Sequence, residues 1–391
     1  MRKWIIFLAL LAAFPPLSTD MYLPAIPTLV RTWEQPLWVV NLTLVAFLVT
    51  YSFFLLVYGP LSDRFGRRYV LKAGISIYIL ASLLCAAAPN VISLIVLRMM
   101  QAAGAASAAS LALAISKDVF EFQHREKVLA YMGVVIALAP MLAPIIGGWT
   151  LAFCSWRIIF VILAGIGGIA LYGVHRMQET LTPSLRTGNV SLVANYLHLL
   201  RNRAYVALVL VVSLAIIPLF AFIAASSDIY ISRLGVSEQA YGYFFGFNAL
   251  ALMAGSFVCI RLSGRITSHS ILTLCYVGIT AGGLLLIRIE HTSPWDLALP
   301  MLLVSFSAGL SRPPSNNLVL RQVQQGAGAA SSLLMFTLMT AGALAMLFIS
   351  LGWEDKILVL GILGAACGVL GCILWLALQW KWLPADKDSK A

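Results

Sequence analysis

The residues best suited to chemistry in this chain are charged side chains placed inside long apolar stretches. Asp20 lies in the string LSTDMYLPAIP, within an apolar run from Trp4 to Val30, and prolines flank it on both sides. Arg98 lies in a second such run, in the string VLRMMQAAGAA. A charge at the centre of a bilayer costs about 2.5–3.5 kcal/mol or more on insertion scales, so both residues indicate a functional site.

Asp20 and Arg98 lie at compatible depths in their apolar runs. Arg98 is about seven residues, or ~10 Å of helix, from the external end of its run, and Asp20 is about ten residues, or ~15 Å, from the end of its own. We therefore expect these opposite charges to be partners. The alternatives are a static structural ion pair and, for Arg98, snorkelling of the side chain to the membrane surface.

The elements that position these residues are predicted to be membrane-spanning helices. The chain has 391 residues, of which 61% are hydrophobic and 10% charged, whereas a soluble domain has about 45–50% apolar and about 25% charged residues. Apolar runs long enough to cross ~30 Å of hydrocarbon recur along the whole chain. We predict an all-α membrane protein with twelve transmembrane helices, at residues 4–29, 37–60, 70–88, 91–114, 127–152, 157–176, 204–230, 239–261, 269–288, 295–319, 327–352 and 357–380.

The distribution of charge predicts the orientation of these helices. The chain has 26 Lys and Arg residues against 15 Asp and Glu residues, a net charge of +11. Most of the basic residues fall in segments that are cytoplasmic if the N-terminus is cytoplasmic, as the positive-inside rule favours. We therefore expect both termini in the cytoplasm, and the basic balance reflects topology rather than nucleic-acid binding. No small-residue cleavage site precedes Asp20, so we expect the first helix to be retained.

The longest polar interruption divides the chain into two halves of six spans each. Each half has a similar turn after its second span, LSDR at residues 61–64 and LSGR at residues 262–265. Two such halves indicate a duplicated six-helix unit, an arrangement found in secondary transporters. We predict an N-terminal six-helix bundle at residues 1–176, a cytoplasmic central loop at 177–203 and a C-terminal six-helix bundle at 204–391.

The turn GPLSDRFGRR, at residues 59–68, must reverse the chain between two spans in six or seven residues. Gly59 and Gly66 suit close approach of the backbone and unusual dihedral angles. Arginines alone would be an ordinary feature of a cytoplasmic loop, but that interpretation does not explain Asp63.

This turn resembles the loop signature of the major facilitator superfamily, roughly G-x-L-x-D-R-x-G-R-[RK], at all of its defining positions. The resemblance implies that the loop acid docks near the start of the eleventh span, at residues 326–332, and latches the cytoplasmic side. The exposed N–H groups and positive dipole at that helix end would attract a carboxylate. The implied latch residues are Gly59, Asp63, Arg64, Gly66, Arg67 and Arg68.

The fifth span, GVVIALAPMLAPIIGGW, resembles the antiporter motif of the same superfamily, although Ala143 replaces the usual glycine. Prolines bend a membrane helix, and small residues let helices approach closely. The residues assigned to this motif are Pro140, Pro144, Gly147 and Gly148. The resemblance implies an exporter rather than an importer.

Further matches narrow the resemblance to one branch of that superfamily. Arg98, Gln101 and Gly104 match the fourth-helix motif, in which the arginine is implicated in proton coupling. The string DMYLPAIP resembles the first helix of the bicyclomycin/chloramphenicol-resistance (Bcr/CflA) branch of 12-span drug–proton antiporters, with Asp20 at its acidic position. Other matches are Ser155-Trp156-Arg157 with Phe160, and Glu179-Thr180.

The resemblance implies a proton-coupled multidrug antiporter of the bacterial inner membrane that exports small amphipathic compounds, such as phenicol-type antibiotics, by alternating access. Asp20 and Arg98 would couple the protons, and protonation of Asp20 would compete with binding of substrate. The implied partners are protons, the substrate and the lipid bilayer, with no cofactor and no nucleic acid, and the implied state is a monomer. Two alternatives stay open: an exporter of a sugar or amino-acid derivative, and a transport-inactive receptor or sensor.

Several other side chains are candidates for the substrate pocket. Asp228 lies near the external end of the seventh span, where it could instead face water. Arg312 precedes Pro313 and Pro314, which we expect to interrupt the helix, unless Arg312 snorkels to the surface. Aromatic residues on membrane helices more often pack than bind. The candidate substrate-binding residues are Tyr22, Tyr51, Phe54, Gln101, Phe222, Asp228, Phe244, Asn248 and Arg312.

The sequence gives no sign of an enzyme or of a metal centre. It contains no nucleophile–base set, no cluster of histidines and acids, and no phosphate-binding loop of credible spacing. Its six cysteines lack metal-binding spacing and are predicted to pack as small apolar residues.

Overall fold

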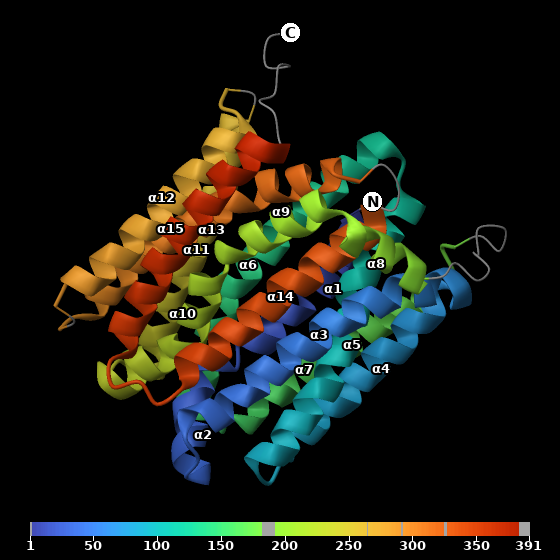
Figure 1. Cartoon of the computed structure of the whole chain (residues 1–391). Coiled ribbons are helices and arrows are strands. Elements are labelled where there is room, and N and C mark those ends of the chain that lie inside the picture. Colours follow the sequence, from blue (N-terminus) through green and yellow to red (C-terminus); the bar gives the residue numbers. More distant parts are fainter. Residues whose placement is uncertain (1, 182–191, 264, 291, 324–326, 383–391) are drawn as a thin grey trace. The chain divides into compact units, whose positions relative to one another are not determined.

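The computed structural model describes residues 2–181, 192–263, 265–290, 292–323 and 327–382, and these residues are almost entirely helical (Figure 1). Eleven segments of the described chain are long and apolar enough to cross a membrane. The elements are α1 (Arg2–Asp20), η1 (Leu23–Ala25), α2 (Ile26–Trp33), α3 (Leu37–Phe65), α4 (Arg67–Ala86), α5 (Val91–Val119), α6 (Phe122–Phe153), α7 (Arg157–Arg176), α8 (Leu192–Arg201), α9 (Arg203–Leu214), α10 (Ile217–Ser227), η3 (Asp228–Arg233), α11 (Glu238–Leu262), α12 (Ser268–Arg288), α13 (Pro294–Arg321), α14 (Ala327–Ser350) and α15 (Lys356–Trp382).

The membrane-helix fold predicted from composition and from apolar runs of spanning length is confirmed. Each predicted span coincides with one helix or with a broken series of helical elements, and most ends agree within a few residues. The predicted tenth span is α13, which is long enough to span but is not among the eleven apolar segments. Its polar stretch SRPPSNN lowers its hydropathy.

Two of the spans are broken, and both breaks follow from prolines. In the first span, α1 ends at Asp20, a short 3-10 turn follows at η1, and α2 continues the span. Pro24 and Pro27 lack the N–H that a continuous helix would use there. The seventh span consists of α9, a turn at residues 215–216, α10 and the π-helical turn η3, and Pro218 in the first turn of α10 lacks the N–H that a continuous helix would use.

Two local expectations were wrong. Pro313 and Pro314 do not interrupt the tenth span, because α13 runs without a break through both residues. The reversal after the second span is also shorter than predicted, since α3 extends to Phe65 and α4 starts at Arg67. Gly66 alone makes the turn, with a φ of 96° that favours glycine, whereas Gly59 is an ordinary helical residue with open space around it.

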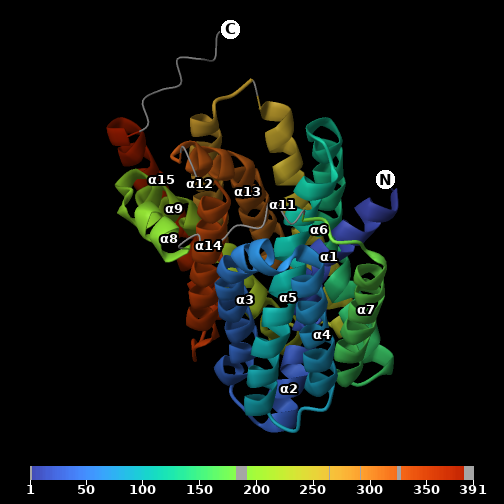
Figure 2. The ribbon, with the colours of Figure 1, turned by 90° about the vertical axis from the view of Figure 1, so that its right-hand side faces the viewer.

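The described chain divides into two compact units, residues 1–191 with 237–243, and residues 192–236 with 244–391. In the first unit α5 packs on both α3 and α4, α4 packs on α7, and α1 packs on α5 and α6. Figure 2 shows α3, α5 and α4 side by side. Helix α8 lies within the stretch predicted as the central loop, while residues 182–191 of that loop lie outside the described residues.

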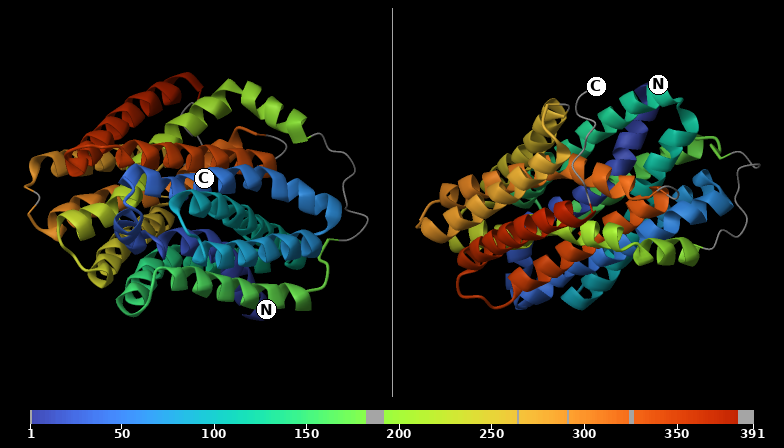
Figure 3. Two further views of the ribbon diagram at one scale, coloured as in Figure 1. Left: turned by 90° about the horizontal axis from the view of Figure 1, so that it is seen from below. Right: turned by 45° about the horizontal axis from the view of Figure 1, so that its top comes forward.

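The second unit repeats the packing plan of the first. Helix α12 packs on α13 and α15, as α4 packs on α5 and α7, and α10 packs on α14. In Figure 3 the red α15 runs beside the lime-green α9. At the α4–α5 contact a methyl group on Gly74 would overlap Ser107, and at the α12–α13 contact one on Gly278 would overlap Ser307. The same small-residue contact in both units supports a duplicated helical unit.

Candidate functional site

Asp20 lies at the break in the first span and is almost completely buried. The residue is 6% exposed, and its Oδ1 atom accepts a hydrogen bond of 2.8 Å from the Thr19 hydroxyl. An unpaired ionised carboxylate in such a place costs far more free energy than a protonated one that is hydrogen-bonded. The break therefore places an ionisable carboxyl group inside the first unit.

The same break leaves a backbone carbonyl open for Arg98. Because α1 ends at Asp20, the Ser18 carbonyl accepts a hydrogen bond of 2.9 Å from Nη1 of Arg98 on α5. That Nη1 atom also donates to Oε1 of Gln101 at 2.6 Å. The Gln101 amide in turn donates to the Ser82 hydroxyl at 2.8 Å. The Arg98 side chain is thus hydrogen-bonded to the backbone of the segment that carries Asp20.

Arg98 and Asp20 do not form the ion pair that their depths suggested. Within the described residues, the hydrogen bonds of Arg98 go to Ser18 and Gln101, and no ion pair joins it to Asp20. Snorkelling is also excluded in this conformation, because the Arg98 side chain is completely buried. Its Nε and Nη2 atoms have no hydrogen-bond partner among the described residues.

Three aromatic rings surround the Arg98 guanidinium in place of a carboxylate. The Cζ atom lies 4.4 Å from the ring centroid of Phe47, 5.0 Å from that of Tyr22 and 5.8 Å from that of Phe160. All three distances are within the range of cation–π interactions. Tyr22, a candidate for the substrate pocket, is fully buried in this cluster, and so is Gln101.

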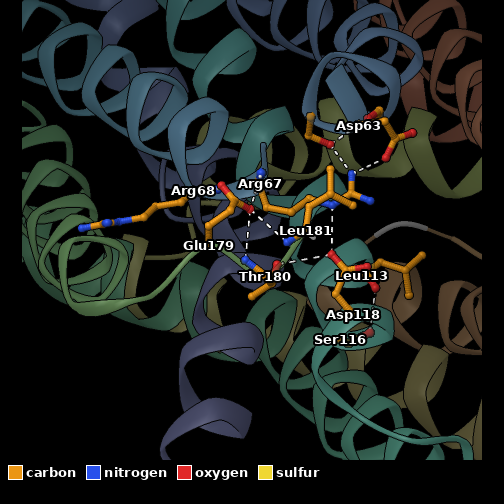
Figure 4. A network of polar contacts seen from close by, with 11 residues as sticks. Asp63, Arg67, Arg68, Leu113, Ser116, Asp118, Glu179, Thr180 and Leu181 are labelled. Atoms are coloured by element: carbon orange, nitrogen blue, oxygen red, sulfur yellow. Dashed lines mark hydrogen bonds and ion pairs between the residues drawn. The ribbon is translucent and has the colours of Figure 1, made fainter. Parts of the chain in front are cut away.

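A second polar cluster lies at the turn around Gly66 (Figure 4). The Glu179 carboxylate accepts hydrogen bonds from the backbone N–H groups of Arg67, at 2.9 Å, and Arg68, at 3.1 Å. It also accepts from the N–H groups of Thr180 and Leu181. Because the first N–H groups of a helix have no partner within it, Glu179 caps α4 from a distant segment of the chain.

Arg67 joins three elements at this cluster. Its guanidinium pairs with Asp63 on α3 at 2.6 Å and with Asp118 on α5 at 3.0 Å, and it donates to the Ser62 hydroxyl. Asp118 also accepts from the Thr180 hydroxyl at 3.3 Å. Arg68 donates to the His175 carbonyl at 2.7 Å, and Arg64 lies over the Phe65 ring.

The predicted docking of Asp63 at the start of the eleventh span stays a prediction. Residues 324–326 at that start, and Gly264 in the related turn of the second half, lie outside the described residues. In the first unit Asp63 is 40% exposed at its side chain and is paired with Arg67.

The glycines of the predicted antiporter motif are contact points of α6. A methyl group on Gly147 would overlap the Met21 carbonyl, and one on Gly148 would overlap the Glu238 carbonyl at the start of α11. Pro140 and Pro144 both lie inside the continuous helix α6. Gly147 therefore packs directly on the bend that carries Asp20.

In the second unit, Asp228 does not simply face water. Its carboxylate pairs with Lys356 at 2.6 Å and its side chain is 26% exposed. A second ion pair of 2.8 Å joins Arg233 to Asp355. The two pairs connect the π-helical turn η3 to the start of α15, and a cavity of about 80 Å³ lies between them. The Arg233 guanidinium, through its hydrogen bond, holds the pKa of the Asp355 carboxyl below its usual value.

The other candidates for a substrate pocket fall into several places. Tyr51 stacks on Phe47 with their ring centroids 6.4 Å apart, and the Phe54 ring contacts those of Phe53 and Tyr58. All of these residues lie on α3, so their rings contact one another along that helix.

In the second unit, Phe244 stacks on Tyr230 at 5.2 Å and contacts Trp295 edge-on. Phe222 is buried against Phe245. Asn248 is buried and donates to the Phe244 carbonyl, and Arg312 on α13 is exposed.

Sequence reasoning missed the residues that complete both clusters. Tyr78 completes the first cluster through a hydrogen bond of 2.7 Å between its hydroxyl and that of Ser18. Phe47, Tyr78 and Ser82 have ordinary types for a membrane helix, and no local pattern distinguishes them. Asp118 could have been found, because it is an acid at the end of an apolar span in the same way as Asp63. Glu179 appeared only as a family match, without a role.

The fold and the buried polar cluster define a class of protein: a multi-pass helical membrane transporter. The sequence model of the Major Facilitator Superfamily matches residues 8–346. The chain belongs to that superfamily, and it is a transporter rather than an enzyme.

Relatives support the narrower resemblance. An MFS-type transporter of Bacillus subtilis, YdgK, is 30% identical over 95% of this chain and 94% of its own. The bicyclomycin resistance protein homolog of Haemophilus influenzae is 28% identical over 87% of both chains. The multidrug transporter MdfA of Escherichia coli O157:H7 is 28% identical over 86% of this chain and 82% of its own. These relatives agree with the drug-antiporter branch indicated by DMYLPAIP.

Solved structures agree on the fold. The D-xylose–proton symporter superposes with a TM-score of 0.75 over 99% of this chain and 98% of its own, at 14% identity. The nucleoside transporter NupG superposes with a TM-score of 0.73 over 96% of this chain and 99% of its own, at 13% identity.

Proposed function

We propose that this chain is a proton-coupled efflux antiporter that exports small amphipathic compounds, phenicol-type antibiotics among them, by alternating access. It works as a monomer in the bacterial inner membrane, with both termini in the cytoplasm. The observation that carries the proposal is the buried Asp20 carboxylate, which lies at a helix break and is tied through Ser18 to a buried arginine.

The mechanism follows from the cost of a buried charge. Asp20 binds a proton when it faces the more acidic side, and the neutral carboxyl is tolerated in the membrane. Loss of the proton leaves a negative charge on Asp20. This charge favours either movement of the carboxylate toward Arg98 or binding of substrate in place of the proton. A single carboxylate that alternates between the two sides is sufficient to exchange protons for substrate, and rocking of two helical units would provide the alternation.

The test measures proton movement from purified protein in liposomes with an acidic interior. A panel of candidate drugs, chloramphenicol included, is added outside, and wild type is compared with Asp20→Asn. We expect drug-dependent proton release in wild type and its loss in the mutant, because asparagine cannot bind and release a proton. Glu354→Gln is the matched control, since Glu354 is an exposed acid just before α15 with no proposed role in coupling or binding, and its proton release should persist.

Two outcomes would contradict the proposal. Proton release that survives in Asp20→Asn removes this residue from the coupling. Absence of a response to every drug, in folded protein, favours the second candidate, an exporter of a sugar or amino-acid derivative, which the same assay tests with metabolites. The relatives named for bicyclomycin and multidrug resistance favour the drug exporter.

A further inference from the structure

The positive charge of Arg98 is surrounded by aromatic rings, and the proton-coupling proposal gives these rings no role. A buried guanidinium needs compensation, and a carboxylate is the usual source. Here the closest groups are the Phe47, Tyr22 and Phe160 rings, which come from α3, the turn after α1, and α7. All three rings are completely buried, so the interaction is not screened by water.

The other groups that face Arg98 are neutral at physiological pH. The ionisable ones are Tyr22, Tyr78 and Cys85, whose side chains have reference pKa values of about 10 and about 8.5. Asp20 itself faces the Thr19 hydroxyl, and Gly147 from α6, which contacts the same bend, carries no ionisable group. Asp20 is therefore the acid best placed to reach the guanidinium.

The geometry leaves part of Arg98 available for such an approach. Nη1 is engaged with Ser18 and Gln101, but Nε and Nη2 lack hydrogen-bond partners among the described residues. Ring faces attract a cation without occupying its N–H donors. A carboxylate that reaches Nε and Nη2 would gain two charge-assisted hydrogen bonds.

We propose that Tyr22, Phe47 and Phe160 form an aromatic cage that holds Arg98 while Asp20 is protonated and competes with ionised Asp20 for the guanidinium. The cage residues are positioning residues, which set the pH at which Asp20 releases its proton. Without the rings, Arg98 would stabilise ionised Asp20 over a wider pH range. This inference rests on the proposed role of Asp20 as the proton carrier.

The test is an infrared titration of the Asp20 carboxyl in purified protein. The carbonyl band of protonated Asp20 is identified as the band that Asp20→Asn removes, and its intensity is followed against pH. We expect the midpoint in Phe47→Leu to lie about one pH unit below that of wild type, since the nearest ring is lost. Phe47→Tyr keeps the ring and should restore the wild-type midpoint.

Phe14→Leu is the matched control for packing. Phe14 is also a fully buried ring, which contacts Tyr78 at 4.6 Å, but it makes no cation–π contact with Arg98. Its midpoint should equal that of wild type. If Phe47→Leu does not fold, Phe160→Leu replaces it, with a smaller shift in the same direction because its ring is farther from Arg98.

The outcomes separate the cage from the transport proposal. A shifted midpoint in the Phe47 or Phe160 variant, without a shift in Phe14→Leu, supports the cage. If no drug drives proton release in the same protein, the proposed function fails while the cage stands. Unchanged midpoints in the cage variants, equal shifts in Phe14→Leu, or an Asp20 band that does not titrate in wild type would each overturn the cage.

Discussion

At the scale of single residues, the buried polar groups of the first unit find their partners in distant parts of the sequence. Arg98 bonds to the Ser18 carbonyl, and that carbonyl is open because the helix ends two residues later. Gly147 contacts the Met21 carbonyl in the same bend. The position of Asp20 is therefore set by both α5 and α6.

The contact at Gly147 leads to a prediction about size. Gly147→Ala would place a methyl group against the Met21 backbone, so we expect it to destabilise the protein by about 1–3 kcal/mol, as overpacking does. The rate of proton-coupled transport should fall at the same time, because the added methyl group would displace the bend that carries Asp20. The measurement is the thermal midpoint in detergent, together with drug-driven proton release.

Gly133→Ala, in the same helix, is the control for this substitution. Gly133 has no atom near its missing Cβ, so alanine there should be neutral or slightly stabilising. Equal midpoints for the two variants would show that the close approach at Gly147 has no energetic importance.

At the scale of elements, the structure ties helix ends to segments far away in the sequence. Glu179 caps α4, and Arg67 joins α3 to α5, so the GPLSDRFGRR turn is part of a network within the first unit. In the second unit, two ion pairs connect η3 to Asp355 and Lys356, where α15 begins. A π-helical turn is an uncommon element that is often found at functional sites, and here it aligns both Asp228 and Arg233 with their partners.

The Asp355–Arg233 pair predicts a dependence of stability on pH. The pKa of Asp355 is lower in the folded protein than its ordinary value of 3.8, chiefly through the Arg233 hydrogen bond. A lowered folded pKa gives stability that is complete above the unfolded pKa and is lost as the pH falls through the folded value. Because both side chains are more than one-third exposed, the contribution should be well below 1 kcal/mol.

Thermal midpoints of wild type and Asp355→Asn, measured from pH 6 to pH 3, test this expectation. The mutant should melt slightly lower at pH 6, and the difference should shrink toward pH 3. Glu354→Gln changes a neighbouring exposed acid and is the matched control. A difference that stays constant over this range would mean that the Asp355 charge does not contribute.

At the scale of the whole molecule, α12 packs within the second unit as α4 packs within the first, and this duplication supports the proposed alternating access. The direction of transport depends on how the helices are oriented in the membrane, which the distribution of basic residues predicts. If both termini are cytoplasmic, the end of the fifth span faces outside, and Cys154 lies there. Cys154 is exposed, whereas Cys85, Cys259, Cys275 and Cys367 are buried and Cys372 is partly buried.

A membrane-impermeant maleimide tests this topology. We expect it to label intact cells at Cys154, and Cys154→Ser should abolish the labelling because the other thiols are shielded by packing or lipid. Inside-out vesicles should label poorly. Labelling of inside-out vesicles but not of cells would reverse the orientation and place the termini outside.

The sequence by itself determined the class of this protein. Apolar runs of spanning length, the positions of Asp20 and Arg98 and the GPLSDRFGRR turn predicted a helical transporter, because hydrophobic length and buried charge are local properties of the chain. The tertiary structure decided which groups surround those charges. Phe47, Tyr78 and Glu179 reach their positions through contacts between helices, and no spacing in the sequence encodes such contacts. For the same reason the charges of Asp20 and Arg98 alone predicted a pair, whereas packing gives the arginine three aromatic rings.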